Sequence, residues 1–121
     1  MLPHAELTVL LTGADLFICP SVYEPLGIVN LEAMACETAV LASRVGGIPE
    51  VVAHKVTGEL VDYNGDAAPF EKALTESISN LMSQPELLKK YGAAGRSRTV
   101  NEFGWDEVAA ATIALYRRVL A

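Results

Sequence analysis

Three short apolar runs, separated by segments that favour turns and helices, constrain the fold of this chain more than any other feature. The first run, residues 14–19, is closed by Pro20, and its length and composition predict a buried parallel strand over residues 15–19. Comparable runs predict strands over residues 39–43 and 59–62. Three parallel strands with flanking helices make an α/β fold, and since a doubly wound domain needs about six strands, the sequence predicts part of one.

Helical periodicity accounts for most of the remaining chain. A helix is predicted over residues 5–12, and two to three C-terminal helices begin near Asp66, at Pro85 and after Gly104. The last helix carries an apolar stripe that predicts packing along its full length. The stripe consists of Trp105, Val108, Ala109, Thr112, Tyr116, Val119 and Leu120.

Two acids flank a predicted helix start in an apolar stretch. Pro25 suits the first turn of a helix, where a missing N–H costs nothing. Residues 26–36 are polar only at Asn30 and Glu32, and a carboxylate is costly to desolvate unless it is hydrogen-bonded. We therefore interpret Glu32 as held for a ligand, with Glu24 preceding the helix as its counterpart.

The helix start between these acids has the features of an anion site. The N–H groups of Leu26, Gly27 and Ile28 are predicted to be free and to face the carboxyl end of the first strand, where open α/β sheets bind ligands. Such N–H groups, with the positive end of the helix dipole, favour a phosphate. Each carboxylate can accept two hydroxyl hydrogens from a vicinal diol. A hydroxyl-rich group on each side of a diphosphate fits this layout.

The sequence of this stretch resembles that of a known family. Residues 24–35 read Glu-Pro-Leu-Gly-Ile-Val-Asn-Leu-Glu-Ala-Met-Ala, which resembles the donor-site motif of retaining GT-B glycosyltransferases of family 4. Residues 39–52 and 57–61 also resemble that family, in the same order. Within the family, residues 18–36 are most similar in sequence to actinobacterial glycogen synthases.

The resemblance implies a fold and an activity. Residues 1–121 would form a single partial domain, the second half of the Rossmann-like nucleotide-sugar-binding domain of a GT-B enzyme, with the N-terminal acceptor domain absent. The whole enzyme would be a retaining hexosyltransferase that moves a hexose, by this resemblance glucose, from ADP-glucose or a UDP-sugar to an acceptor glycan, as in glycogen synthesis. It implies no metal or other cofactor, and this chain alone is expected to be inactive. A cytoplasmic location is expected because no stretch reads as a membrane span or a signal peptide.

The resemblance also implies roles for individual residues. Glu24 would be the catalytic residue and would accept hydrogen bonds from the donor hexose. The backbone of Leu26, Gly27 and Ile28 would meet the sugar and the distal phosphate, and Glu32 would bind the ribose.

Each of these residues has an ordinary structural alternative. Glu32 could be a solvated acid in the first half of a helix, and Glu24 a charge that favours a helix start. Gly46 and Gly47 could border the donor as a loop, or could form an ordinary connection from strand to helix that needs glycine dihedrals.

The charge distribution departs from the family pattern. Residues 1–71 carry ten acids and only Arg44 and Lys55 as bases. The family places an arginine and a lysine upstream of the first glutamate, whereas this chain has neither residue before Glu24. The bases of the C-terminal helices, Arg96 with Arg98 and Arg117 with Arg118, are predicted to lie on solvated faces.

Several functions are excluded or kept as alternatives. A net charge of −6 argues against a nucleic-acid partner, and no apolar run reaches the ~18 residues of a membrane span. Cys19 and Cys36 are interpreted as small core residues. The alternative function is a truncated, non-catalytic module that binds nucleotides or self-associates, either through an exposed strand at residues 15–19 or 39–43 or through the C-terminal helix.

Overall fold

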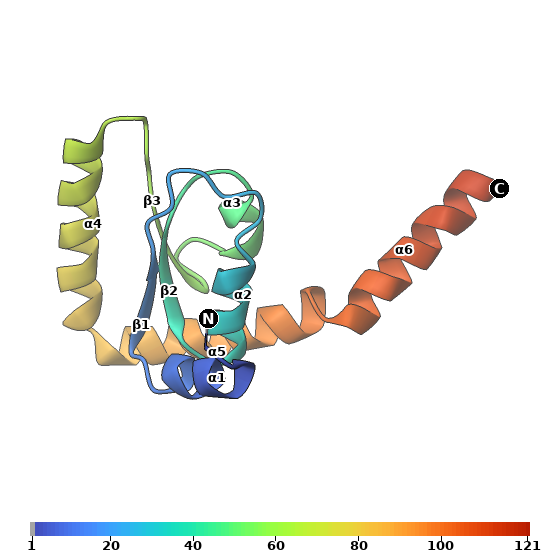
Figure 1. Cartoon of the computed structure of the whole chain (residues 1–121), viewed down its shortest axis with the longest axis horizontal. Coiled ribbons are helices and arrows are strands. Elements are labelled where there is room, and N and C mark those ends of the chain that lie inside the picture. The colour runs from blue at the N-terminus through green and yellow to red at the C-terminus, as the bar shows by residue number, and fades with distance from the viewer. Residues whose placement is uncertain (1) are drawn as a thin grey trace.

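The computed structural model describes residues 2–121 as a three-stranded parallel sheet with six helices around and beyond it (Figure 1). The predicted α/β fold is confirmed, and each strand lies within one residue of its predicted bounds. In chain order the elements are α1 (His4–Thr12), β1 (Leu16–Cys19), α2 (Ile28–Ala35), β2 (Ala39–Ser43), α3 (Ile48–Val51), β3 (Gly58–Val61), α4 (Ala67–Met82), α5 (Pro85–Glu102) and α6 (Trp105–Leu120).

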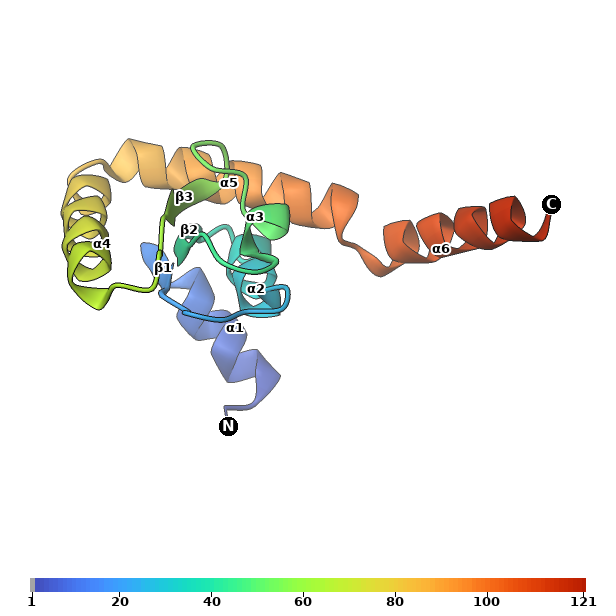
Figure 2. The same ribbon diagram turned by 90° about the horizontal axis from the view of Figure 1, so that it is seen from above.

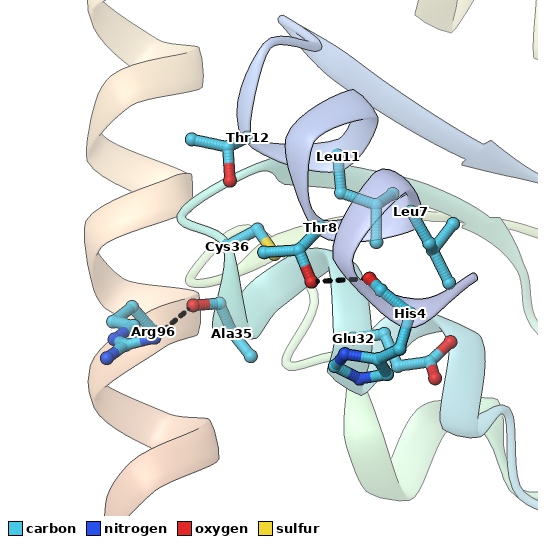
Figure 3. Close-up of a pocket in the computed structure, with 9 residues that line it drawn as sticks. All are labelled: His4, Leu7, Thr8, Leu11, Thr12, Glu32, Ala35, Cys36 and Arg96. Atoms are coloured by element: carbon cyan, nitrogen blue, oxygen red, sulfur yellow. Dashed lines mark hydrogen bonds between the residues drawn. The ribbon is translucent and has the colours of Figure 1, made fainter. Parts of the chain in front are cut away.

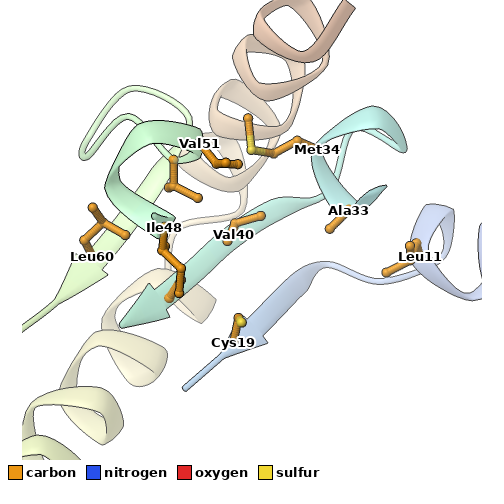
Figure 4. Close-up of a cluster of buried hydrophobic side chains, with 10 residues drawn as sticks. Leu11, Cys19, Ala33, Met34, Val40, Ile48, Val51 and Leu60 are labelled. Atoms are coloured by element: carbon orange, nitrogen blue, oxygen red, sulfur yellow. The ribbon is translucent and has the colours of Figure 1, made fainter. Parts of the chain in front are cut away.

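The sheet has the strand order β1-β2-β3, and helices cover both of its faces. All five residues of β2 are buried, as expected for a central parallel strand. Its side chains alternate between two clusters because successive residues of a strand point to opposite faces. Val40 and Ala42 join the cluster beneath α1, α2 and α3 (Figure 4), whereas Ala39 and Leu41 pack with α4 and α5.

The position of β2 corrects one prediction about sheet edges. Residues 39–43 pair with β1 on one side and with β3 on the other, so this strand has no open edge. Within residues 2–121, β1 pairs with β2 alone. The open edge predicted at residues 15–19 is therefore present in the described part of the chain.

Helix α2 begins three residues later than Pro25 predicts. Gly27 is its N-cap residue, in the left-handed conformation with φ of 89°. Pro25 and Leu26 lie in the bend that leads to the helix. The bend persists because the side chain of Glu24 accepts a hydrogen bond from the N–H of Gly27, which closes a turn ahead of the helix.

Helix α5 crosses the amino ends of the strands and packs against α2 (Figure 1). A Cβ atom on Gly92 would lie 1.9 Å from the carbonyl oxygen of Glu37, so this contact requires glycine. Arg98 donates to the carbonyls of Val51 at 3.0 Å and Glu50 at 2.9 Å, at the carboxyl end of α3. The prediction of a solvated face is therefore wrong for Arg98, whose side chain is only 26% exposed.

Helix α6 extends away from the rest of the molecule (Figure 2). None of its residues is buried, and the side chain of Trp105 is 87% exposed. The predicted apolar stripe is present, but it is not packed along its length in the structure of residues 2–121. Over the same residues, no helix combines the length and the apolar character needed to cross a membrane.

Candidate functional site

The candidate site begins at the bend of residues 20–27, where the chain leaves the carboxyl end of β1. Two hydrogen bonds from the end of β2 hold the start of this bend. The hydroxyl of Ser43, at the end of β2, donates to the carbonyl of Ser21 and, at 3.4 Å, to that of Cys19. The bend is thereby held at the carboxyl edge of the sheet, where ligands bind in open α/β folds.

Glu24 is half-buried in this bend and uses both its backbone and its side chain. Its carbonyl oxygen accepts the N–H of Gly47 at 3.1 Å. Its carboxylate oxygen Oε1 accepts the N–H of Gly27 at 3.2 Å. Glu24 is therefore held between α2 and the loop after β2, with one carboxylate oxygen engaged inside the protein.

The loop of Gly46 and Gly47 lies directly on the backbone of this bend. A Cβ atom on Gly46 would lie 1.8 Å from the carbonyl oxygen of Glu24, and one on Gly47 would lie 2.3 Å from that of Pro25. Gly46 also has a positive φ of 51°. Neither position has room for a side chain, so the structure brings together the two glycines and the glutamate that the sequence analysis considered separately.

The predicted cradle of three N–H groups is only partly available. The N–H of Gly27 is occupied by Glu24, which corrects the prediction that it is free. Among residues 2–121, no acceptor is found for the N–H of Leu26 or Ile28. The positive end of α2 therefore offers two backbone donors beside Glu24.

Glu32 lines a separate cavity of about 310 Å³ between α1, α2 and α5 (Figure 3). His4 on α1 and Arg96 on α5 also line this cavity, and Arg96 donates to the carbonyl of Ala35 at the end of α2. The full lining is His4, Leu7, Thr8, Leu11, Thr12, Glu32, Ala35, Cys36 and Arg96. The cavity combines a carboxylate, a guanidinium, an imidazole and two hydroxyls over an apolar floor.

The two acids occupy different surroundings. The cavity at Glu32 does not include Glu24, whose neighbours are the bend and the glycine loop. Exposed apolar side chains lie on the Glu24 side: Val22, Tyr23, Leu26 and Ile28. The structure thus places both predicted acids at α2, one before its first turn and one in its last turn, and the cavity that Glu32 lines does not reach Glu24.

Sequence reasoning missed three polar residues of this region. His4 and Arg96 reach the cavity of Glu32 from α1 and α5, and only a tertiary contact brings them there. Asn30 in the first turn of α2 is fully buried, and within residues 2–121 neither its Oδ1 nor its Nδ2 has a hydrogen-bond partner. The apolar context of Asn30 in the sequence was the one available indication.

Neither the cysteines nor the other potential metal ligands form a second site within the described residues. Cys19 is buried in the core, as predicted, whereas Cys36 is only half-buried and lines the cavity of Glu32. No three His, Cys, Asp or Glu side chains within residues 2–121 lie close enough together to hold a metal ion.

Comparison with known sequences supports the resemblance. Residues 1–98 match the family described as glycosyl transferases group 1. An alpha-maltose-1-phosphate synthase from Mycolicibacterium smegmatis is 52% identical over the whole of this chain, which covers 32% of that protein. A glycogen synthase from Mycobacterium tuberculosis is 36% identical over 95% of this chain, which covers 27% of it. The chain therefore spans about a third of the length of these relatives or less.

Solved structures with the same fold agree. A sucrose-phosphate synthase from Thermosynechococcus elongatus superimposes with a TM-score of 0.85 at 36% identity, over 99% of this chain and 29% of that one. The HepE protein of Anabaena in complex with UDP-glucose gives a TM-score of 0.62 at 26% identity, over 78% of this chain and 25% of that one.

Proposed function

The chain belongs to the group 1 glycosyl transferases, and on that premise we propose that it forms the donor-binding part of a retaining hexosyltransferase. The donor is a nucleotide diphosphate sugar, either ADP-glucose or a UDP-sugar. The whole protein transfers a hexose, which is glucose in this proposal, to an acceptor glycan. The sequence of residues 18–36 favours glycogen synthesis as the process. Because the chain spans about a third of its relatives, transfer itself is proposed for the whole protein and not for these residues alone.

The cavity at Glu32 carries this proposal. Its volume of about 310 Å³ lies at the lower end of the range of small-molecule sites. An ionised carboxylate accepts two hydrogen bonds, and Glu32 in such a cavity can bind the 2′ and 3′ hydroxyls of a ribose. Arg96 supplies a cation from α5 to an otherwise acidic half of the chain. We assign this cavity to the nucleoside.

Glu24 and the start of α2 supply the other half of the donor site. The N–H groups of Leu26 and Ile28 and the helix dipole favour the distal phosphate. Glu24 then accepts hydroxyls of the hexose, beside the loop of Gly46 and Gly47. In this arrangement the diphosphate lies at the first turn of α2, between the hexose and the nucleoside.

Calorimetry with UDP, ADP and the corresponding glucose nucleotides tests this division. Glu32→Gln is expected to weaken binding of nucleotide and nucleotide sugar alike, by about 10-fold or more, because a charge-assisted hydrogen bond contributes about 1.5 to 3 kcal/mol. Glu24→Gln is expected to weaken only the nucleotide sugar. Glu76→Gln, an exposed acid on α4, is the matched control and should leave both affinities unchanged. Wild-type binding that survives Glu32→Gln unaltered would overturn the assignment.

The exposed helix α6 favours a second candidate function, self-association. Trp105, Ala109, Thr112, Tyr116 and Val119 recur at spacings of four, three, four and three, which is the seam of a coiled coil. The partner we propose for this seam is α6 of a second copy.

Charge complementarity favours an antiparallel pair. At about 100° per residue, Asp106 and Arg117 lie about 100° and 120° around the helix from Trp105, on the same side of the seam. In a two-fold antiparallel pair, Asp106 near the start of one helix faces Arg117 near the end of the other, twice. In a two-fold parallel pair, residues on one side of the seam lie on opposite outer edges of the dimer, so Asp106 and Arg117 would not face each other.

Light scattering of the chain tests this pairing. The wild type is expected to form a dimer, Asp106→Arg and Arg117→Asp are each expected to give monomers, and the double exchange is expected to restore the dimer because the charge pairs reform with inverted sign. A wild-type chain that is monomeric at every concentration would show that α6 is covered by another part of the protein or stays free.

A further inference from the structure

The bend that holds Glu24 contains one donor beside which two side chains with acceptor oxygens lie. The donor is the N–H of Gly27, the N-cap residue of α2, which has no side chain of its own to cap the helix. Its present acceptor is Oε1 of Glu24 at 3.2 Å, a long hydrogen bond. While this bond exists, half of the carboxylate is turned toward the protein.

The second acceptor is the side chain of Asn30. Asn30 is the third residue of α2, and its own N–H donates to the carbonyl of Gly27 at 2.9 Å. A Cβ atom on Gly27 would lie 2.7 Å from Nδ2 of Asn30, so the amide group lies against the N-cap residue. A half-turn of the amide group exchanges the positions of its nitrogen and its oxygen. The two orientations have nearly the same shape and differ in the hydrogen bonds that they allow. Oδ1 can thus take the place beside Gly27.

This is the position from which a side chain caps its own helix. In a capping box, the third residue of the helix reaches back and accepts the N–H of the N-cap residue. Asn30 is completely buried, and both of its polar atoms lack partners in the part of the chain that the structure describes, a costly arrangement that natural proteins rarely retain without a role.

We propose that Asn30 is a positioning residue that releases Glu24 to the donor sugar. When the carboxylate turns to the hydroxyls of the hexose, the N–H of Gly27 passes from Glu24 to Oδ1 of Asn30. The backbone of the bend stays in place because the carbonyl of Glu24 remains bonded to the N–H of Gly47. Without Asn30, the same movement leaves a buried N–H without an acceptor from the protein. This inference rests on the role proposed above for Glu24.

Hydrogen exchange of the Gly27 amide tests the exchange of acceptors without any ligand. Asn30→Leu keeps the branched shape of the side chain and removes both polar atoms. The amide is expected to stay protected in Glu24→Ala, where Asn30 accepts it, and in Asn30→Leu, where Glu24 accepts it. It is expected to exchange at least 10-fold faster in the double variant than in either single one. Equal loss of protection in Glu24→Ala and in the double variant would overturn the inference.

Binding then connects this exchange of acceptors to the sugar. Asn30→Leu is expected to weaken UDP-glucose or ADP-glucose by about 10-fold while leaving UDP or ADP unchanged, and to have no further effect in a Glu24→Ala background. Thr99→Val is the control, because Oγ1 of Thr99 on α5 is also buried and unpartnered but lies outside the bend. An equal loss for nucleotide and nucleotide sugar would reduce Asn30 to a structural residue. A wild-type chain that binds neither contradicts the proposed function and leaves the exchange result standing.

Discussion

Helices α4 and α6 have the same length and equally amphipathic sequences, yet only α4 has buried residues. Each has 16 residues with apolar side chains along one face. Phe70 and Leu81 of α4 are buried against the sheet, whereas no residue of α6 is buried (Figures 1 and 2). Periodicity therefore identifies the face of a helix that can be buried, and the presence of a partner decides whether it is.

The largest difference is expected from truncation of one aromatic residue in each helix. Phe70→Ala should lower the free energy of unfolding by about 3 to 5 kcal/mol, because it leaves a cavity in the core. It also removes an edge-to-face contact with Tyr63, whose ring centroid lies 5.2 Å from that of Phe70. In a monomeric chain, Trp105→Ala should change this free energy by less than about 0.5 kcal/mol, since the ring is exposed. Denaturant unfolding measures both, and a large loss for Trp105→Ala would mean that α6 is packed in solution.

A smaller difference is expected between two arginines. Arg98→Met on α5 should cost about 1.5 to 3 kcal/mol, because the carbonyls of Glu50 and Val51 lose a charged donor. Arg117→Met on α6 should produce no measurable change in a monomeric chain, because its surroundings are solvent. Thermal unfolding at equal protein concentration compares them, and similar shifts in Tm would remove the distinction between packed and projecting helices.

The smallest difference concerns the first turns of α4 and α6. Asp66 is the N-cap residue of α4 and accepts the N–H of Ala68 at 3.2 Å, so Asp66→Ala should cost about 0.5 to 2 kcal/mol. Asp106 lies in the first turn of α6, and in a monomeric chain it is expected to interact with the helix dipole, so Asp106→Ala should have a weaker effect there. Global unfolding by circular dichroism reports the first substitution, and local helicity the second. An equal loss from both would contradict the ranking.

The start of α2 shows why a local pattern misplaced a boundary. Proline is favoured in the first turn of a helix, and on that basis Pro25 predicts the start. The bend of residues 24–27 instead stays open, because the loop of Gly46 and Gly47 lies on its backbone and because Glu24 accepts the N–H of Gly27. The contact with the loop joins segments about 20 residues apart in the chain, and periodicity within one helix cannot report it.

The sequence by itself determined the three parallel strands, the order of the helices and the identity of the two acids, because strand burial and helical spacing follow from short-range patterns of apolar residues. The tertiary structure alone decided which groups meet. It brought His4 and Arg96 to the cavity that Glu32 lines and closed the glycine loop on Glu24. Within residues 2–121 it also buried Asn30 without partners and left α6 uncovered. These features depend on how packed elements exclude water and on the space between them, and neither quantity is a property of a single segment.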